Sequence, residues 1–282
     1  MNIIKPMIYV LLTLVLSTGL SVAGMAQATD GTSTDEPVIP ATQPGELYLP
    51  SENPMADLAA SLDAARLSNR QLLVVLGANW CHDSRALASR LFEEPLSTTI
   101  NKHYEILFVD VGYLEKGKDV ITSLGVPVYY ATPTVLIVDP VSRRVINAQN
   151  RHQWGDAASI GMQESVEYFQ QFTDTDLAAL QSDNEVDVNL QELLQEIETF
   201  EQAQADRLYL AYATLTPMLM AYKEGDKNAF SEETWNEVRD YRYSIPTDVE
   251  ALRAEARTRV ASGENNIKLT YPVYPAFSWD TP

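Results

Sequence analysis

Short, unbroken apolar runs constrain the fold of this 282-residue chain more than any other sequence feature. Three such runs occupy residues 71–77 (QLLVVLG), 105–111 (EILFVDV) and 134–138 (TVLIV). Apolar runs of this length without polar alternation are typical of strands buried on both faces. Apolar residues at helical spacing lie before and between the runs. The alternation predicts an α/β fold, a mixed central sheet flanked by helices.

The other elements of this region follow from helical spacing and from turn residues. A turn at Asp139-Pro140 precedes a fourth expected strand, and Gly125 ends a short helix. The expected order is helix, strand, helix, strand, helix, strand, strand, helix. We expect helices at 55–68, near 86–92 and 95–102, at 119–124 and at 155–172, with the fourth strand at 143–146.

Charge and cysteine content exclude several function classes. Lys plus Arg number 20 against 39 Asp plus Glu, so the formal net charge is −19. Phosphates of a nucleic acid and an anionic membrane surface would both repel such a chain, so neither is an expected partner. A single cysteine, Cys81, rules out an intramolecular disulfide. With three histidines beside it, zinc sites of four cysteines or of two cysteines and two histidines are also impossible.

The N-terminal residues have the pattern of a signal peptide. Lys5 precedes an apolar run of 14 residues, 7–20, and Ala26 and Ala28 stand at the −3 and −1 positions of a cut after Ala28. The run is shorter than the about 20 residues that a membrane span needs. We therefore expect export to the periplasm or outside the cell, with removal of residues 1–28 and no membrane insertion afterwards. Residues 29–53, rich in Thr, Pro, Asp and Glu, are expected to be a flexible leader.

After residue 173 the pattern becomes helical. We expect residues 174–282 to be an all-α domain in which about four helices between 186 and 262 pack against the preceding domain. Pro217 is expected to kink or break one of them, and the capping box at 247–250 to begin the last, which Gly263 ends. We expect the aromatic tail, Tyr271 to Trp279, to be buried on the folded body. The acids Glu192, Glu196, Glu198 and Glu201 are interpreted as a solvated helix face.

Cys81 lies where a strand turns into a helix, within Trp80-Cys81-His82-Asp83-Ser84. A helix N-terminus lowers the pKa of a cysteine through its unpaired N–H groups and its dipole, and the thiolate is the nucleophilic form. A protonated His82 would stabilise the thiolate further, whereas Asp83 would oppose it. Ser84, one turn along, could donate a hydrogen bond to the sulfur. The competing interpretation is an inert packing thiol.

The same residues resemble the thioredoxin active-site turn, with Ser84 in place of the second cysteine. A second motif, Ala131-Thr132-Pro133-Thr134, precedes an apolar strand and resembles the cis-proline turn of that family, with Pro133 52 residues after Cys81. The resemblance covers residues 54–173. It implies a thioredoxin-like fold there, a cis bond at Thr132-Pro133, and contact between this turn and Cys81.

The resemblance also implies which residues form the site. The catalytic candidates are Cys81, Ser84 and His82, and the substrate-binding candidates are Trp80, Thr132 and Pro133, where backbone groups of the family face an extended peptide. Trp80 as a packing aromatic and His82 as a solvent-facing residue are the simpler alternatives. Tyr129 and Tyr130 could line a peptide groove or belong to the sheet.

The chain departs from the family at Ser84 and at Val75, which stands where thioredoxin has a buried acid. Monothiol chemistry remains possible: attack on a disulfide, a mixed disulfide, and release by another thiol. This suits isomerisation, deglutathionylation or client trapping, with protein thiols or disulfides, or glutathione, as partners. No cofactor or metal is expected, because the neighbouring histidines lack ligand spacing for a copper or iron site with Cys81. Whether the chain is an enzyme stays open, since a non-catalytic module that binds a partner through the same groove also fits.

Overall fold

The computed structural model describes residues 46–148, 153–173 and 188–280. All of them belong to one compact unit, Thr42–Pro282. The expected signal peptide at 1–28 and the expected leader up to residue 45 lie outside the described residues. The expected domain boundary falls between residue 173, which is described, and residue 174, which is not. Among the described residues, no helix has the length and apolar character needed to cross a membrane.

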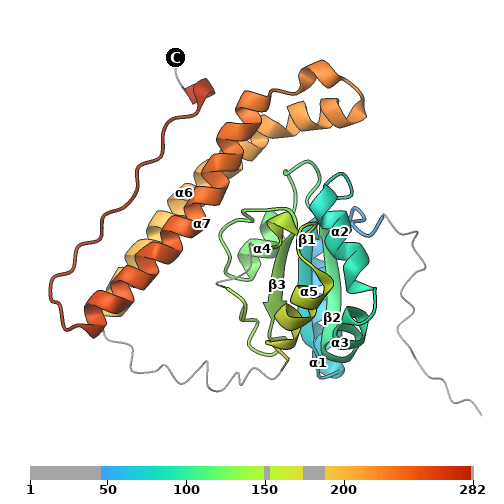
Figure 1. The fold of residues 1–282 in the computed structure, drawn as a ribbon, viewed down its shortest axis with the longest axis horizontal. Helices are drawn as coiled ribbons and strands as arrows, with labels where there is room; N and C mark the ends of the chain where they lie inside the picture. The colour runs from blue at the N-terminus through green and yellow to red at the C-terminus, as the bar shows by residue number, and fades with distance from the viewer. Residues whose placement is uncertain (1–45, 149–152, 174–187, 281–282) are drawn as a thin grey trace, which may run out of the picture. The chain divides into compact units, whose positions relative to one another are not determined.

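A mixed three-stranded sheet forms the centre of the first part, as predicted (Figure 1). The strands are β1 (Gln71–Gly77), β2 (Tyr104–Asp110) and β3 (Thr134–Val138), in the spatial order β2-β1-β3. β1 runs parallel to β2, where Val74 pairs with Leu107, and antiparallel to β3, where Val74 pairs with Leu136. The central strand is buried on both faces, which explains its unbroken apolar run.

Helices cover both faces of this sheet. They are α1 (Pro54–Leu67), α2 (His82–Leu91), α3 (Leu96–His103), α4 (Lys118–Ser123) and α5 (Met162–Gln170), with a 3₁₀ turn η1 at Gln153–Asp156. Alternate β1 residues point to opposite faces. Leu72, Val74 and Leu76 pack in the core that contains residues of α1 and α4. Leu73 and Val75 pack in the core that contains residues of α2, α3 and α5.

Two expected elements of this region are wrong. Residues 143–146 form no strand, because only a single bridge joins Val145 to Val138. The expected closing helix at 155–172 is divided into η1 and α5, which begins only at Met162. Gly161, the N-cap of α5, has an extended conformation and separates the two pieces.

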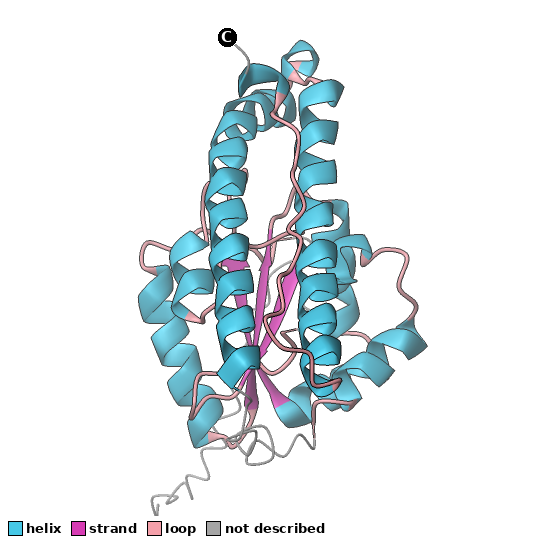
Figure 2. Ribbon diagram, turned by 90° about the vertical axis from the view of Figure 1, so that its left-hand side faces the viewer, coloured by secondary structure: helices cyan, strands magenta, loops and turns pink. Residues whose placement is uncertain are grey.

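Between residues 188 and 280, the described part of the C-terminal region, there are two long helices rather than about four. α6 (Val188–Glu224) and α7 (Glu232–Ala261) lie side by side (Figure 2), joined through the short 3₁₀ turn η3 (Lys227–Ala229). We call α6 and α7 the helical hairpin. Pro217 lies inside α6, and the expected capping box at 247–250 lies inside α7. Buried residues continue on both sides of Pro217, as with Leu215 and Leu219, so packing offsets the backbone hydrogen bond that proline removes.

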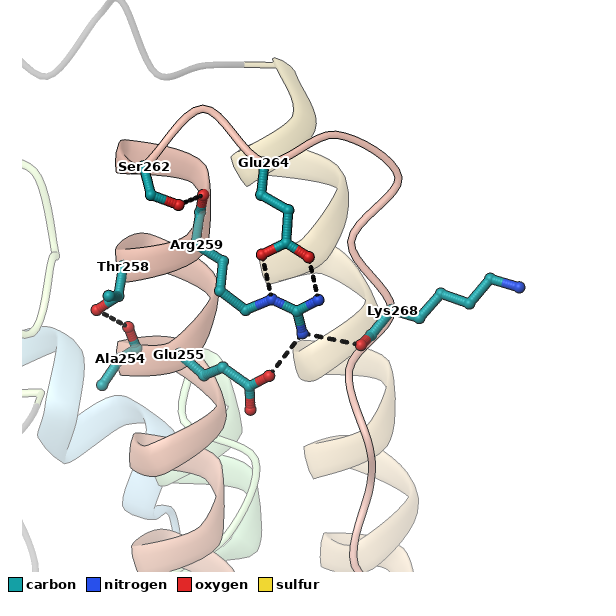
Figure 3. Close-up of polar contacts among 7 residues, drawn as sticks. All are labelled: Ala254, Glu255, Thr258, Arg259, Ser262, Glu264 and Lys268. Atoms are coloured by element: carbon teal, nitrogen blue, oxygen red, sulfur yellow. Dashed lines mark hydrogen bonds and ion pairs between the residues drawn. The ribbon is translucent and has the colours of Figure 1, made fainter.

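The aromatic tail packs on the helical hairpin, but the expectation that it is buried holds in full only for Phe277; Tyr271, Tyr274 and Trp279 are half-buried. The Phe200 and Tyr271 rings are 5.0 Å apart, and the Tyr241 and Phe277 rings 5.3 Å apart. Arg259 holds the start of the tail (Figure 3): its Nε donates to Glu264 at 2.9 Å, and its Nη1 donates to the Lys268 carbonyl at 3.0 Å.

The helical hairpin also packs against the sheet-containing part, as expected. The Tyr212 hydroxyl donates to the Tyr129 carbonyl at 2.8 Å. Glu201 accepts from the Tyr130 hydroxyl at 2.9 Å and pairs with Arg253 at 2.7 Å. Glu201 is only 2% exposed, so its interpretation as part of a solvated helix face is wrong. A buried carboxylate needs such partners to offset its lost hydration.

Candidate functional site

Cys81 occupies the turn between β1 and α2. Its backbone N–H donates to the Ala78 carbonyl at 3.0 Å, and its carbonyl accepts from Arg85 N at 3.2 Å, the first turn of the helix. Cys81 is the N-cap of α2, the position that precedes the unpaired N–H groups of the first helical turn, and its side chain makes no capping hydrogen bond to them. The residue is 9% exposed. This placement agrees with the prediction from the sequence.

The second predicted motif meets the sulfur. The Cys81 thiol donates to the Thr132 carbonyl at 3.1 Å, and the Thr132 hydroxyl lies 3.5 Å from the same sulfur. The peptide bond between Thr132 and Pro133 is cis, in agreement with the expectation. Two segments far apart in the sequence thus form one site, with the sulfur bound to the backbone that precedes β3.

The Ser84 hydroxyl bonds to Ala78 rather than to the Cys81 sulfur, the partner suggested by the sequence. Its side chain is fully buried, and its hydroxyl accepts from the Ala78 N–H at 3.3 Å. Ser84 therefore fixes the end of β1 against the first turn of α2, while the polar contacts of the Cys81 sulfur are with Thr132. The role of Ser84 in this structure is therefore to stabilise the turn between β1 and α2.

Tyr48 is the site residue that the sequence analysis missed. It lies within the expected flexible leader at 29–53, yet it is 1% exposed and its hydroxyl donates to the Ser84 carbonyl at 3.2 Å. Its backbone pairs with the Asn79 side chain, which accepts from Tyr48 N at 3.3 Å and donates to Tyr48 O at 2.9 Å. The leader assignment is therefore wrong for this stretch, because one buried aromatic ring anchors it. No periodic signal precedes Tyr48 that could have revealed this.

Burial raises the pKa of the Tyr48 phenol well above its usual range, and negative charge on Cys81 raises it further, against the opposing hydrogen bond with Ser84. The phenol therefore stays protonated beside the sulfur. Gly77 makes this packing possible, since a Cβ at that position would lie 2.6 Å from the Tyr48 ring. A glycine at the end of β1 is required by this close approach.

Trp80 is half-buried and holds a neighbouring loop. Its indole Nε1 donates to the Gly112 carbonyl at 2.7 Å, and its ring stacks on Tyr113 with centroids 6.4 Å apart. Lys223 of α6 places its Nζ 5.6 Å from the Trp80 ring centroid. These contacts describe a packing aromatic at the border of the site, where the helical hairpin reaches it.

His82 is exposed at the first position of α2, and the neighbouring Asp83 carboxylate accepts from Ala158 N at 3.0 Å. Tyr129 and Tyr130, which could have lined a groove or joined the sheet, do neither. Both are buried between β3 and the helical hairpin, outside any strand.

The chemistry available at this site is that of one thiol. The sulfur lies at a helix N-terminus, where its thiol donates to the Thr132 carbonyl and the Thr132 hydroxyl donates to it. Within residues 46–148, 153–173 and 188–280, no three His, Cys, Asp or Glu side chains gather to hold a metal.

Comparisons with known proteins find similarity over part of the chain. A family model described as thioredoxin-like matches residues 53–140, a span that includes β1, the Cys81 turn and β3. A solved structure of a disulphide isomerase from Xylella fastidiosa Temecula1 is 26% identical, with a TM-score of 0.41; the match covers 45% of this chain and 99% of the other. A comparison with curated proteins found no match. The predicted thioredoxin-like fold is confirmed for the matched residues.

Proposed function

We propose that this chain, whose residues 53–140 form a thioredoxin-like domain, performs thiol–disulfide exchange through Cys81 alone. The observation that supports this most strongly is the placement of the sulfur. It lies at the N-cap of α2, in hydrogen-bond contact with the Thr132 carbonyl and hydroxyl. Because Cys81 is the single cysteine, the chain cannot resolve a mixed disulfide by itself.

The proposed exchange has two balanced steps. The Cys81 thiolate attacks one sulfur of a disulfide R–S–S–R′, which forms Cys81–S–S–R and expels R′–S⁻. A second thiol R″–SH then loses its proton and attacks the R sulfur, which forms R–S–S–R″ and returns the Cys81 thiolate. The cycle exchanges disulfides without net oxidation or reduction. It suits isomerisation, deglutathionylation or client trapping, with protein thiols or disulfides, or glutathione, as the exchanging partners.

His82, Ser84 and Trp80 take supporting roles in this proposal. His82 lies at the exposed start of α2, where a positive charge would favour the thiolate. Ser84 and Trp80 hold the two sides of the turn through Ala78 and Gly112. Thr132 and Pro133 provide the backbone against which the sulfur and its bound partner would rest.

Mass spectrometry of the intact protein tests the proposal. Full-length protein is incubated with oxidised glutathione and then with an excess of a small thiol. We expect one glutathione adduct on Cys81, and its complete release by the thiol. Cys81→Ser is the control and should form no adduct. Absence of an adduct under conditions that modify a free cysteine would refute the proposed exchange.

A non-catalytic interaction module is the second candidate, and one observation favours it. Cys81 is 9% exposed, and the residues that lead to its partner, 128–131, are buried. The rate of Cys81 alkylation as a function of pH separates the two functions. A thiol that reacts well below pH about 8.5 supports exchange, whereas one that reacts more slowly than an unfolded cysteine supports the module.

We further infer that the chain is exported to the periplasm or secreted, with cleavage after Ala28. The supporting pattern is Lys5, the apolar run at 7–20 and the small residues at 24–28. N-terminal sequencing of protein recovered from the exported fraction would identify Thr29 as the first residue. Recovery of the uncleaved chain inside the cell would contradict the inference.

A further inference from the structure

The helical hairpin contacts both segments that flank the Cys81 sulfur. On one side, Lys223 of α6 lies over Trp80, the residue that precedes Cys81. On the other side, Tyr212 of α6 donates to the carbonyl of Tyr129, in the segment that leads to Thr132. The hairpin therefore reaches both borders of the thiol site, with a hydrogen bond on the Tyr129 side and a lysine over the Trp80 ring on the other.

Backbone acceptors near the sulfur already have donors. The carbonyl of Tyr129 accepts from Tyr212 at 2.8 Å, that of Ala131 from the Thr134 hydroxyl at 2.7 Å, and that of Thr132 from Cys81 at 3.1 Å. An extended polypeptide binds along a strand or segment by pairing its main chain with free backbone groups. At the Tyr129 carbonyl, such pairing would have to displace the Tyr212 hydroxyl of α6.

In the loop beside Trp80, the carbonyls of Gly112 and Tyr113 also have hydrogen-bond donors. The Thr216 hydroxyl of α6 lies 2.9 Å from the Tyr113 carbonyl, and Trp80 itself donates to Gly112 at 2.7 Å. Stacking of the Tyr212 and Tyr129 rings, with centroids 5.3 Å apart, adds packing to the hydrogen bond on the opposite border. His82, in contrast, is exposed, so an approach past the start of α2 stays open to a small molecule.

We propose that the helical hairpin restricts Cys81 to small disulfides and excludes disulfides held within a polypeptide, with Tyr212 and Thr216 as the specificity-determining residues. This inference rests on the proposed exchange and decides between the substrates that it leaves open. In the first step a low-molecular-weight disulfide gives up one half to Cys81 and releases the other as a thiolate. In the second step a low-molecular-weight thiol removes that half.

Single-turnover rates with two disulfides test the proposal. Full-length protein without reductant is mixed with hydroxyethyl disulfide or with insulin, and mixed-disulfide formation on Cys81 is followed by mass. Each rate is divided by the rate of free cysteine with the same disulfide, which removes the intrinsic reactivity of the substrate. We expect the normalised rate with insulin to be lower by on the order of tenfold or more, because the polypeptide must wait for local opening of the hairpin.

Variants of the hairpin identify the cause. Tyr212→Phe and Thr216→Val keep the shape of α6 but remove one hydrogen bond each to the thioredoxin-like domain. Each should raise the insulin rate roughly five-fold and leave the hydroxyethyl disulfide rate unchanged. Tyr209→Phe and Thr214→Val are matched controls: the buried Tyr209 hydroxyl has no partner in the described part of the chain, and Thr214 bonds only within α6. Circular dichroism confirms that each variant is folded.

The outcomes separate this inference from the function on which it rests. Equal normalised rates for the two disulfides in the natural protein would overturn the restriction to small substrates while leaving exchange intact. Unchanged insulin rates in folded Tyr212→Phe and Thr216→Val would overturn the role of these two residues. Reaction with neither disulfide would instead refute the proposed exchange itself.

Discussion

Ser84 is the residue at which this site differs most from a dithiol one. Cysteines three residues apart at a helix start are close enough to bridge, so Ser84→Cys supplies the missing resolving thiol. We expect the variant to reduce hydroxyethyl disulfide weakly and to end with an internal disulfide between Cys81 and the introduced cysteine. The natural protein should end as a mixed disulfide. The gain is expected to be weak because Ser84 is fully buried and its hydroxyl accepts from Ala78 N–H, a role that a thiol fills poorly.

The mass of the product distinguishes these results, since an internal disulfide loses two hydrogens and carries no adduct. Ser89→Cys is the control, because Ser89 is exposed on the same helix and lies beyond the first turn. Efficient net reduction by the natural protein would contradict the monothiol mechanism.

Gly77 is the residue on which the packing of Tyr48 depends. A Cβ at this position would lie 2.6 Å from two atoms of the Tyr48 ring and 2.7 Å from the Ser84 hydroxyl. We expect Gly77→Ala to lower the free energy of unfolding by about 1–3 kcal/mol, the usual cost of overpacking. It should also change the alkylation rate of Cys81, because Tyr48 and Ser84 hold the turn.

Chemical denaturation measures the loss of stability, and Gly161→Ala is the matched control. A methyl group on the Cα of Gly161 would have no atom within 4 Å, so this substitution causes no overpacking and should cost only the preference of a helix N-cap for glycine over alanine. A Gly77→Ala protein as stable as the natural one would show that the Tyr48 ring can move aside.

At the scale of elements, buried tyrosines of the helical hairpin cause the protein to lose stability at alkaline pH. Burial raises the pKa of Tyr212 to about 12, although the nearby Arg242 lowers it. An unfolded tyrosine ionises near pH about 10. A raised pKa in the folded state gives stability that is complete below pH about 10 and is lost as the pH rises towards 12.

We therefore expect the free energy of unfolding to fall above pH about 10, with Tyr212 contributing up to about 1.4 kcal/mol per pH unit. Denaturation between pH about 9 and 11.5 measures this slope. Tyr212→Phe should be less stable at neutral pH, because it loses the hydrogen bond to Tyr129, yet its slope should be shallower. An equal slope in the two proteins would mean that Tyr212 ionises in the folded state as easily as in the unfolded chain.

The same helices show how local signals can mislead. Pro217 and the sequence at 247–250 are ordinary signs of helix ends, yet both lie inside long helices. In α7, Ile245 and Val249 are buried on either side of the apparent boundary, and Pro246 is buried as well. Burial of a continuous face against the neighbouring helix outweighs these local preferences, and a single sequence does not contain that neighbour's position.

At the scale of the whole molecule, one buried carboxylate joins the helical hairpin to the thioredoxin-like domain. Glu201 is 2% exposed and is held by Tyr130 at 2.9 Å and Arg253 at 2.7 Å. Glu201→Ala removes an acceptor from the buried Tyr130 hydroxyl and the ion-pair partner of Arg253, whose side chain is 28% exposed. We expect the free energy of unfolding to fall by about 2–3 kcal/mol, with hairpin and domain still unfolding in one transition.

Far-ultraviolet and near-ultraviolet circular dichroism, followed through the same denaturation, measure both expectations. Glu192→Ala, an exposed acid on the same helix, is the control and should leave the stability unchanged. Glu201→Gln should recover part of the loss, since its amide oxygen can still accept from Tyr130. Two separate transitions in the natural protein would contradict a hairpin that folds as one unit with the domain.

The sequence by itself determined the parts of this protein that depend on neighbours along the chain. The apolar runs specified β1, β2 and β3. β1 and β3 are buried on both faces, which favours apolar residues at successive positions, whereas most residues of the outer strand β2 are only partly buried. The placement of Cys81 at the start of α2, and of Thr132 and Pro133 before β3, followed from the same runs. These motifs also indicated that the two segments would meet.

Only the tertiary structure decided which side chains surround that thiol. Tyr48 comes from a stretch without periodicity, and one long-range contact with Ser84 places it in the site. Glu201 has the sequence context of an exposed acid, and only its partners on two other elements bury it. The hydrogen bonds of Tyr212 to Tyr129 and of Thr216 to Tyr113 likewise join segments far apart in the chain. The periodicity of a sequence indicates which face of a helix or strand is buried. Which other segment covers that face is decided only when the whole chain is folded.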